Sequence, residues 1–191
     1  MGIFAVILLL LIVALIGYII MAYNRLVRLK HNVKAAWSNI DVLLKQRHDE
    51  LPKLVTTCRE YMKFEQETLE KVVQARSGVS NAMDSGDMTQ LGLAESVMSN
   101  TLGRLFALTE NYPELKSNES FLRLQSRISS LENAIADRRE YYNNSVNINN
   151  IVVEEFPTNV VAEKFNFKQA QLFEVNEEEL TDVDMQQLFV A

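Results

Sequence analysis

The sequence has few of the residues that build disulfide frameworks, zinc sites and flexible linkers. Its 191 residues include one Cys, two His, three Pro and six Gly. A single Cys cannot form a disulfide within the chain, and one Cys with two His cannot supply the four ligands of a Cys/His zinc site. The low Pro and Gly contents exclude collagen and Pro-rich linkers. We therefore predict neither a structural metal nor a disulfide scaffold.

An excess of positive charge is also missing. The chain carries 19 Lys and Arg against 25 Asp and Glu, a formal net charge of −6. Nucleic acids are bound mainly through cations that face phosphates, so we predict no nucleic-acid partner. The charge is unevenly distributed, because no acidic residue precedes Asp41. From Asp41 onward, 25 acidic side chains face 15 basic ones, which gives this part of the chain a formal charge of −10.

One long hydrophobic run stands at the N-terminus. Residues 2–23 contain no charged side chain, and the first charge is Arg25. As a helix, these 22 residues would span roughly 33 Å, close to the ~30 Å hydrocarbon core of a bilayer. A cleaved signal peptide is the alternative, but it requires a basic segment before the run and a small-residue cleavage site after it. We predict that residues 1–23 form a transmembrane anchor.

A cluster of cations follows this run directly, and it consists of Arg25, Arg28, Lys30 and Lys34. By the positive-inside rule, these residues place the rest of the chain in the cytoplasm and the N-terminus outside. Each cation near the surface also attracts anionic lipid by about 1 kcal/mol. We predict possible lipid-headgroup contacts at these four positions, although a role as a topological signal alone also explains them.

Helical spacing dominates the next part of the chain. Apolar residues recur at three- and four-residue steps from Trp37 to Val73, and Arg47 and Glu65 place a charge at two of these steps. The first turn signal after this run begins at Ser77-Gly78. We therefore expect one helical segment that ends there.

Pro52 interrupts this segment without shifting its apolar phase. Proline removes a backbone hydrogen bond and clashes with the preceding turn of a helix. We favour one long kinked helix, continuous with the membrane anchor. Two helices that meet at Pro52, with Asp49 as the N-cap of the second, remain the alternative.

Two more helices are predicted downstream. One begins near Met88 and ends at Glu110–Pro113, because the residue before proline is biased away from helix. The other follows a cap region at residues 117–120 and runs to about Val153. The fold class is all-α: a single transmembrane helix continues into an antiparallel three- or four-helix bundle with long helices, at residues 24–155.

The C-terminal segment, residues 156–191, has weaker periodicity. We expect an irregular tail or short helices that pack on the bundle. From Glu174 onward the tail is acidic and contains no cation. Its last residues offer a possible partner-docking face, made of Met185, Leu188 and Phe189, for another protein or a neighbouring subunit.

Residues that could carry chemistry are sparse. His48 lies beside Asp49, but no second His is within a helical turn, and Cys58 lies on the apolar stripe. Arg138 and Arg139 could bind an anion, although pairing with acids on a neighbouring helix is favoured. No phosphate-binding loop or nucleophile-elbow motif occurs. We predict no catalytic, cofactor-binding or metal-binding residues.

Several blocks together resemble the LemA family, over residues 1 to about 174. The most distinctive are Trp37-Ser38-Asn39-Ile40-Asp41-Val42 and Glu110-Asn111-Tyr112-Pro113, and a third is Phe156-Pro157-Thr158-Asn159-Val160-Val161-Ala162. The chain departs from the family where Phe-Gly-Phe-Lys is usual, since it has Asn166 in place of Gly. Asn tolerates a left-handed conformation, so the turn can be kept.

The resemblance implies a bacterial membrane protein with one N-terminal span, an antiparallel helical bundle and no established enzymatic activity. We therefore expect a non-enzymatic scaffold of the bacterial inner membrane, whose partners are the lipid bilayer, other copies of itself as a homo-oligomer, and a membrane protein. A regulatory adaptor for an envelope protease or a signalling partner is the alternative.

Overall fold

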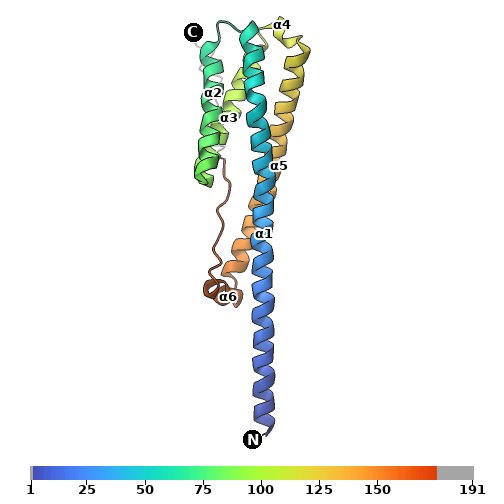
Figure 1. The fold of residues 1–191 in the computed structure, drawn as a ribbon, viewed down its shortest axis with the longest axis vertical. Helices are drawn as coiled ribbons and strands as arrows, with labels where there is room; N and C mark the ends of the chain where they lie inside the picture. Colours follow the sequence, from blue (N-terminus) through green and yellow to red (C-terminus); the bar gives the residue numbers. More distant parts are fainter. Residues whose placement is uncertain (1, 176–191) are drawn as a thin grey trace, which may run out of the picture. The chain divides into compact units, whose positions relative to one another are not determined.

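The computed structural model describes residues 2–175, and helices make up most of this part (Figure 1). The helices are α1 (Gly2–Tyr61), α2 (Gln66–Ser85), α3 (Met88–Thr109), α4 (Pro113–Lys116), α5 (Glu119–Glu154) and α6 (Thr158–Lys164). No strand occurs between residues 2 and 175, so the all-α prediction is confirmed. The described residues form two packed units: unit 1 is residues 2–39 with 138–172, and unit 2 is residues 40–137 with 173–175.

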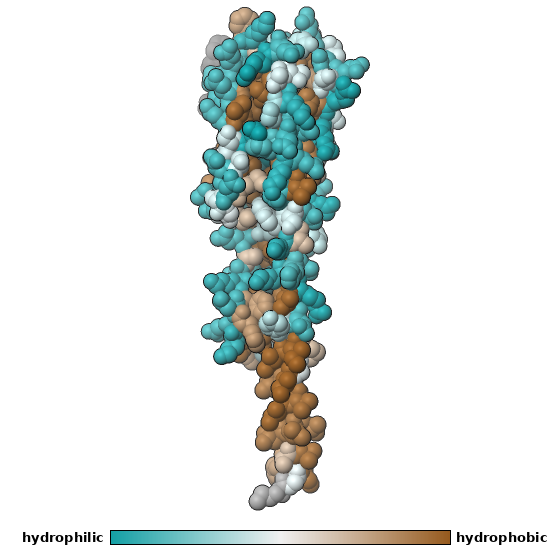
Figure 2. All heavy atoms as spheres, in the orientation of Figure 1, coloured by the Kyte–Doolittle hydropathy of each residue, from teal (hydrophilic) through white to brown (hydrophobic). Residues whose placement is uncertain are grey.

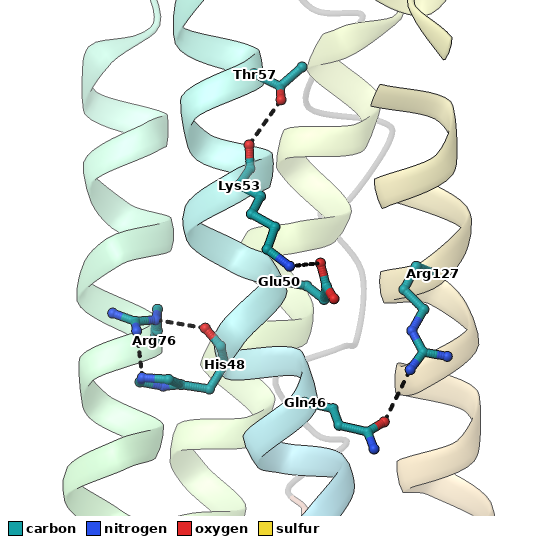
Figure 3. Close-up of polar contacts among 7 residues, drawn as sticks. All are labelled: Gln46, His48, Glu50, Lys53, Thr57, Arg76 and Arg127. Atoms are coloured by element: carbon teal, nitrogen blue, oxygen red, sulfur yellow. Dashed lines mark hydrogen bonds and ion pairs between the residues drawn. The ribbon is translucent and has the colours of Figure 1, made fainter. Parts of the chain in front are cut away.

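The predicted continuity through Pro52 is confirmed, because α1 contains this residue in its interior. Proline cannot donate the hydrogen bond that would normally reach the carbonyl four residues earlier, which belongs to His48. Arg76 of α2 supplies a substitute, since its Nε donates to the His48 carbonyl oxygen over 3.0 Å (Figure 3). A neighbouring helix thus satisfies the acceptor that proline leaves free.

The predicted end of this helical segment at Ser77-Gly78 is wrong. α1 ends at Tyr61, and α2 runs through Ser77 and Gly78 to Ser85. The four-residue turn between α1 and α2 contains neither Gly nor Pro, so it carries no sequence signal. Side chains from elsewhere in unit 2 hold it instead: Tyr112 donates to Glu65 over 3.1 Å, and Asn118 donates to the Tyr61 hydroxyl over 3.0 Å.

The predicted boundaries of α3 and α5 agree with the structure, because local chemistry sets them. Gly86 ends α2 in the left-handed conformation at φ 69°, and the Asp87 carboxylate accepts from the first backbone N–H groups of α3. α3 ends before Pro113. The Asn118 side chain caps α5 by accepting from two backbone N–H groups at 2.9 and 3.0 Å.

Unit 2 has an apolar core to which α1, α2, α3 and α5 contribute, and these helices lie side by side (Figure 1). The short segment after residue 172 adds one aromatic ring, since Phe173 is fully buried. The largest fully buried apolar side chains of this core are Ile40, Leu44, Leu51, Leu54, Met62, Leu69, Leu91, Met98, Phe121 and Phe173. This arrangement matches the helical stripe predicted from the sequence, which included all four α1 members: Ile40, Leu44, Leu51 and Leu54.

Unit 1 is built from the first part of α1, the end of α5 and α6. The Trp37 and Tyr142 rings meet edge to face, with centroids 5.8 Å apart. After α6, the chain turns at Asn166, whose φ of 57° confirms the left-handed turn predicted there. The Asn150 side chain then exchanges two hydrogen bonds of 2.9 Å with the backbone of Ala170, which fixes the irregular segment against α5.

Candidate functional site at the membrane end of unit 1

The first four turns of α1 present an uninterrupted apolar surface. An 18-residue window in this helix has a mean hydropathy of 3.3, and none of it is buried. By length and composition, it is the one described helix that could cross a membrane. Figure 2 shows this part of α1 as a continuous brown surface. Such exposure is costly in water and favourable in hydrocarbon, which makes this segment the candidate membrane anchor.

The end of this apolar surface is where α6 packs. The Tyr18 hydroxyl lies 3.2 Å from the Thr158 hydroxyl. The Tyr23 ring meets Phe165 and Phe167 edge to face, with centroids 4.9 and 5.7 Å apart. These contacts place α6 and the turn after it beside the last two turns of the predicted span.

A small apolar core joins these elements. Ala22 and Leu26 of α1 are buried together with Val152 of α5 and with Val161 and Ala162 of α6. Two small alanines in this cluster permit close approach of the helices. The sequence predicted short helices in this region, but not that one of them would pack on the membrane anchor.

α6 nevertheless leaves large apolar side chains uncovered. Phe156 is 78 % exposed, Val160 60 % and Phe165 50 %. Exposed apolar residues scattered singly need no explanation, but contiguous ones mark interaction or membrane surfaces. These three residues share one groove with the membrane anchor.

This groove lies between α1 and α6 and has a volume of about 390 Å³. α1 contributes Leu15, Tyr18 and Ile19, while the segment around α6 contributes mainly aromatic and aliphatic side chains. Lys164 is the one charged residue that lines it. The lining surface is almost entirely apolar, so Lys164 lines the groove with its methylene stem and not with its ammonium group.

The four cations after the span are all exposed on α1, at Arg25, Arg28, Lys30 and Lys34. None of them forms an ion pair with a carboxylate in the described part of the chain. Their contact with lipid headgroups stays a prediction. The predicted docking residues Met185, Leu188 and Phe189 lie outside the described residues.

Unit 2 contains a buried ion pair that the sequence only partly indicated. Arg47, noted as a charge within the apolar stripe, is 2 % exposed and donates to Glu95 of α3, which is 4 % exposed. Glu132 of α5 lies near this pair, and its pKa is raised mainly by burial and also by the charge of Glu95, while Arg47 opposes the shift. Helical periodicity flagged Arg47 but gave no signal for its two acidic neighbours.

Cys58 and His48 both lie in surroundings that suit structural roles. Burial raises the pKa of the Cys58 thiol to about 12, so the thiolate is scarce at neutral pH. Burial and the nearby Arg76 cation lower the pKa of His48. Its ring Nε2 lies 2.5 Å from Arg76 Nη2 and accepts from it in the neutral form (Figure 3).

One further expectation from the sequence has a structural outcome. Arg138 and Arg139 form no ion pair with a described carboxylate, so the favoured pairing with a neighbouring helix is not found. Within residues 2–175, no group of three or more His, Cys, Asp and Glu side chains could hold a metal ion.

Comparisons with known proteins agree on one family. The LemA family model matches residues 36–186. Protein LemA of Metamycoplasma hominis is 32 % identical over 86 % of this chain and 74 % of its own length. Magnetosome protein MamQ 2 of Paramagnetospirillum magneticum is 27 % identical over 93 % of this chain and 74 % of its own. Magnetosome protein MamQ of Magnetospirillum gryphiswaldense is 24 % identical, over 85 % and 68 %. None of these names denotes an enzyme, and the chain belongs to the LemA family.

Proposed function

We propose that this protein is a non-enzymatic, membrane-anchored scaffold of the bacterial inner membrane. In this proposal the anchor crosses the membrane with the N-terminus outside, and the acidic helical bundle is displayed in the cytoplasm, where it binds proteins. The observation that carries the proposal is that α1 is one helix from Gly2 to Tyr61. Its first part is exposed hydrocarbon, and its last part supplies the core of unit 2.

This continuity places the candidate anchor and part of the bundle on one helix. The first part of α1 carries the exposed apolar surface, and Ile40, Leu44, Leu51 and Leu54 of the same helix lie in the core of unit 2. In this proposal, one helix therefore carries both the membrane anchor and part of the protein-binding bundle.

Self-association is the form of binding that we propose first. Leu93 and Val97 of α3 are 48 % and 50 % exposed. They stand four residues apart and so share one face of the helix. Anchoring confines copies to two dimensions and raises their effective concentration, so that a weak apolar contact of this kind is populated.

The oligomeric state of the full chain tests self-association. In mild detergent, mass photometry should show oligomers for the parent protein and smaller species for the double variant Leu93→Ser/Val97→Ser. The matched control is Val42→Ser/Val73→Ser, which removes two other exposed apolar residues of unit 2 (51 % and 42 %). Only monomers in the parent protein, or equal dissociation by both variants, would contradict a self-association surface on α3.

Crosslinking in membranes separates the scaffold from the adaptor alternative. Recovery of the chain crosslinked to itself supports the scaffold. A stoichiometric foreign partner, such as an envelope protease or a signalling protein, supports the adaptor instead. Both readings keep the same anchor and differ only in what the bundle binds.

Membrane orientation is tested with a single introduced thiol. Ser77 is exposed on α2, so Ser77→Cys places a reactive thiol on unit 2. The native Cys58 is buried, with a raised pKa, and should give little background. A membrane-impermeant maleimide should label the variant only after the membrane is opened. Equal labelling of intact spheroplasts would place the bundle outside.

A further inference from the structure

We propose that the groove between α1 and α6 binds one acyl chain of an anionic phospholipid, whose phosphate lies beside Lys164. The proposal rests on the membrane anchorage of α1 and not on the scaffold role. It assigns a binding site to α6, a helix for which the sequence predicted packing on the bundle only.

Depth in the membrane gives the first argument. The groove reaches from Leu15 to Ile19 on α1, and α6 also contacts Tyr23 through Phe165. If Tyr23 lies at the edge of the hydrocarbon, Leu15 is about 12 Å inside it, at 1.5 Å per residue. At this depth the solvent is the acyl region of one leaflet, so acyl chains are the molecules that meet the groove.

The exposed side chains of the α6 region give the second argument. Phe156, Val160 and Phe165 are each at least half exposed, and such exposure of large apolar side chains is unfavourable in water. Interfacial elements bury such residues roughly 5–10 Å into the boundary between headgroups and acyl chains. The depth fixed by α1 is therefore the depth at which these three side chains are stable.

The chemistry of the lining gives the third argument. Aliphatic and aromatic side chains cover the groove, and Lys164 is its one charged residue. A volume of about 390 Å³ lies within the range of sites that hold small ligands, roughly 300–1,000 Å³. An amphiphile matches this arrangement, because its hydrocarbon chain would meet the apolar lining and its anionic headgroup would meet the ammonium group of the exposed Lys164. A purely apolar ligand would leave the lysine unused.

The test uses the full-length protein in nanodiscs that contain equal amounts of phosphatidylglycerol and phosphatidylcholine. After release, native mass spectrometry counts the phospholipids that stay bound. We expect one retained lipid per chain, with phosphatidylglycerol preferred. Val160→Trp, which fills the groove from an exposed position, should lower the retained fraction about tenfold, equivalent to the loss of roughly two buried methylene groups.

The cation is tested separately from the groove. Lys164→Gln should keep the lipid but lower the preference for phosphatidylglycerol about fivefold, the effect expected of one surface lysine. The matched controls are Val42→Trp, at an exposed valine of unit 2, and Lys168→Gln, at an exposed lysine four residues away. Both controls should retain lipid as the parent protein does. Circular dichroism verifies that each variant keeps its helix content.

Three outcomes would overturn the proposal. One is a parent protein that releases without lipid, and another is equal retention by Val160→Trp and Val42→Trp. The third comes from a photo-crosslinking amino acid at position 160: capture of a second copy or another protein, instead of lipid, makes the groove a protein interface. Failure of the scaffold proposal is distinguishable from failure of the lipid site. In that case the parent protein would be monomeric, while lipid retention would be intact.

Discussion

Leucine has opposite surroundings in the two units. Leu9, in the anchor part of unit 1, is 61 % exposed, while Leu54, in the core of unit 2, is fully buried. Both belong to the same helix, α1. The difference lies in the pattern around them: Leu9 stands in an all-apolar run, and Leu54 stands on one stripe of an amphipathic helix. A helix that is apolar all round is stable with lipid on every side, whereas an amphipathic helix buries one face against protein.

Arginine shows the same contrast. Arg25 of unit 1 is exposed directly after the span, whereas Arg47 of unit 2 is buried against Glu95. The exposed cation needs only water or anionic lipid. The buried one depends on its acidic partner, since an unpaired charge in a core is costly. Removal of this single charge is therefore expected to lower the stability of unit 2.

The largest expected effect is on this buried pair. Arg47→Met leaves Glu95 buried without its cation and Glu132 beside it, so we expect the free energy of unfolding to fall by about 3–5 kcal/mol at pH 7. Denaturant titration followed by circular dichroism measures it. The double variant Arg47→Met/Glu95→Leu should recover much of the loss, because it removes both charges. If the double variant does not regain free energy of unfolding, the Arg47–Glu95 pair stabilises the fold by more than mutual neutralisation of its two charges.

The leucine contrast gives the second prediction. Leu54→Ala opens a cavity in the core of unit 2 and should cost about 2–5 kcal/mol. Leu9→Ala removes the same atoms from a side chain that touches no protein core, so unfolding of the bundle should be unchanged in the same titration. Similar losses in both variants would mean that the anchor is packed against protein rather than lipid.

A pair of glycines in α3 sharpens the contrast within unit 2. A Cβ atom built at Gly92 would lie 1.8 Å from the backbone oxygen of Glu174, next to the buried Phe173. Gly92→Ala should therefore displace this segment and cost about 1–3 kcal/mol. Gly103 has no atom within 4 Å of the same position, so Gly103→Ala should stabilise the helix by about 1 kcal/mol. The midpoint of thermal unfolding should fall for Gly92→Ala and rise for Gly103→Ala.

The smallest expected effect is a pH dependence at the contact between α1 and α2. The pKa of His48 is lowered in the folded state by burial and by Arg76, so the unfolded chain binds the proton more tightly. The contribution to stability is complete above about pH 6.5, the ordinary His value, and is lost as the pH falls below it. His48→Gln should lose less stability than the parent between pH 7.5 and 5.5.

Local chemistry explains which parts of the fold were predictable. The anchor followed from one uncharged run, the end of α3 from Pro113, and the turn at residue 166 from the tolerance of Asn for positive φ. Continuity through Pro52 was also predicted, from the apolar phase. The end of α1 was not, because its turn has no Gly or Pro and depends on hydrogen bonds from Tyr112 and Asn118.

The sequence by itself determined the apolar helix that is the candidate membrane anchor, the cations that follow it and the all-α class, because each depends on composition or spacing along one segment. Tertiary structure alone decided that Arg47 is paired in a core and that α6 forms a groove with the anchor at Leu15 and Tyr18. Both features join residues at least 48 positions apart in the chain. Their stability comes from desolvation and packing between segments, which no periodicity within one segment records.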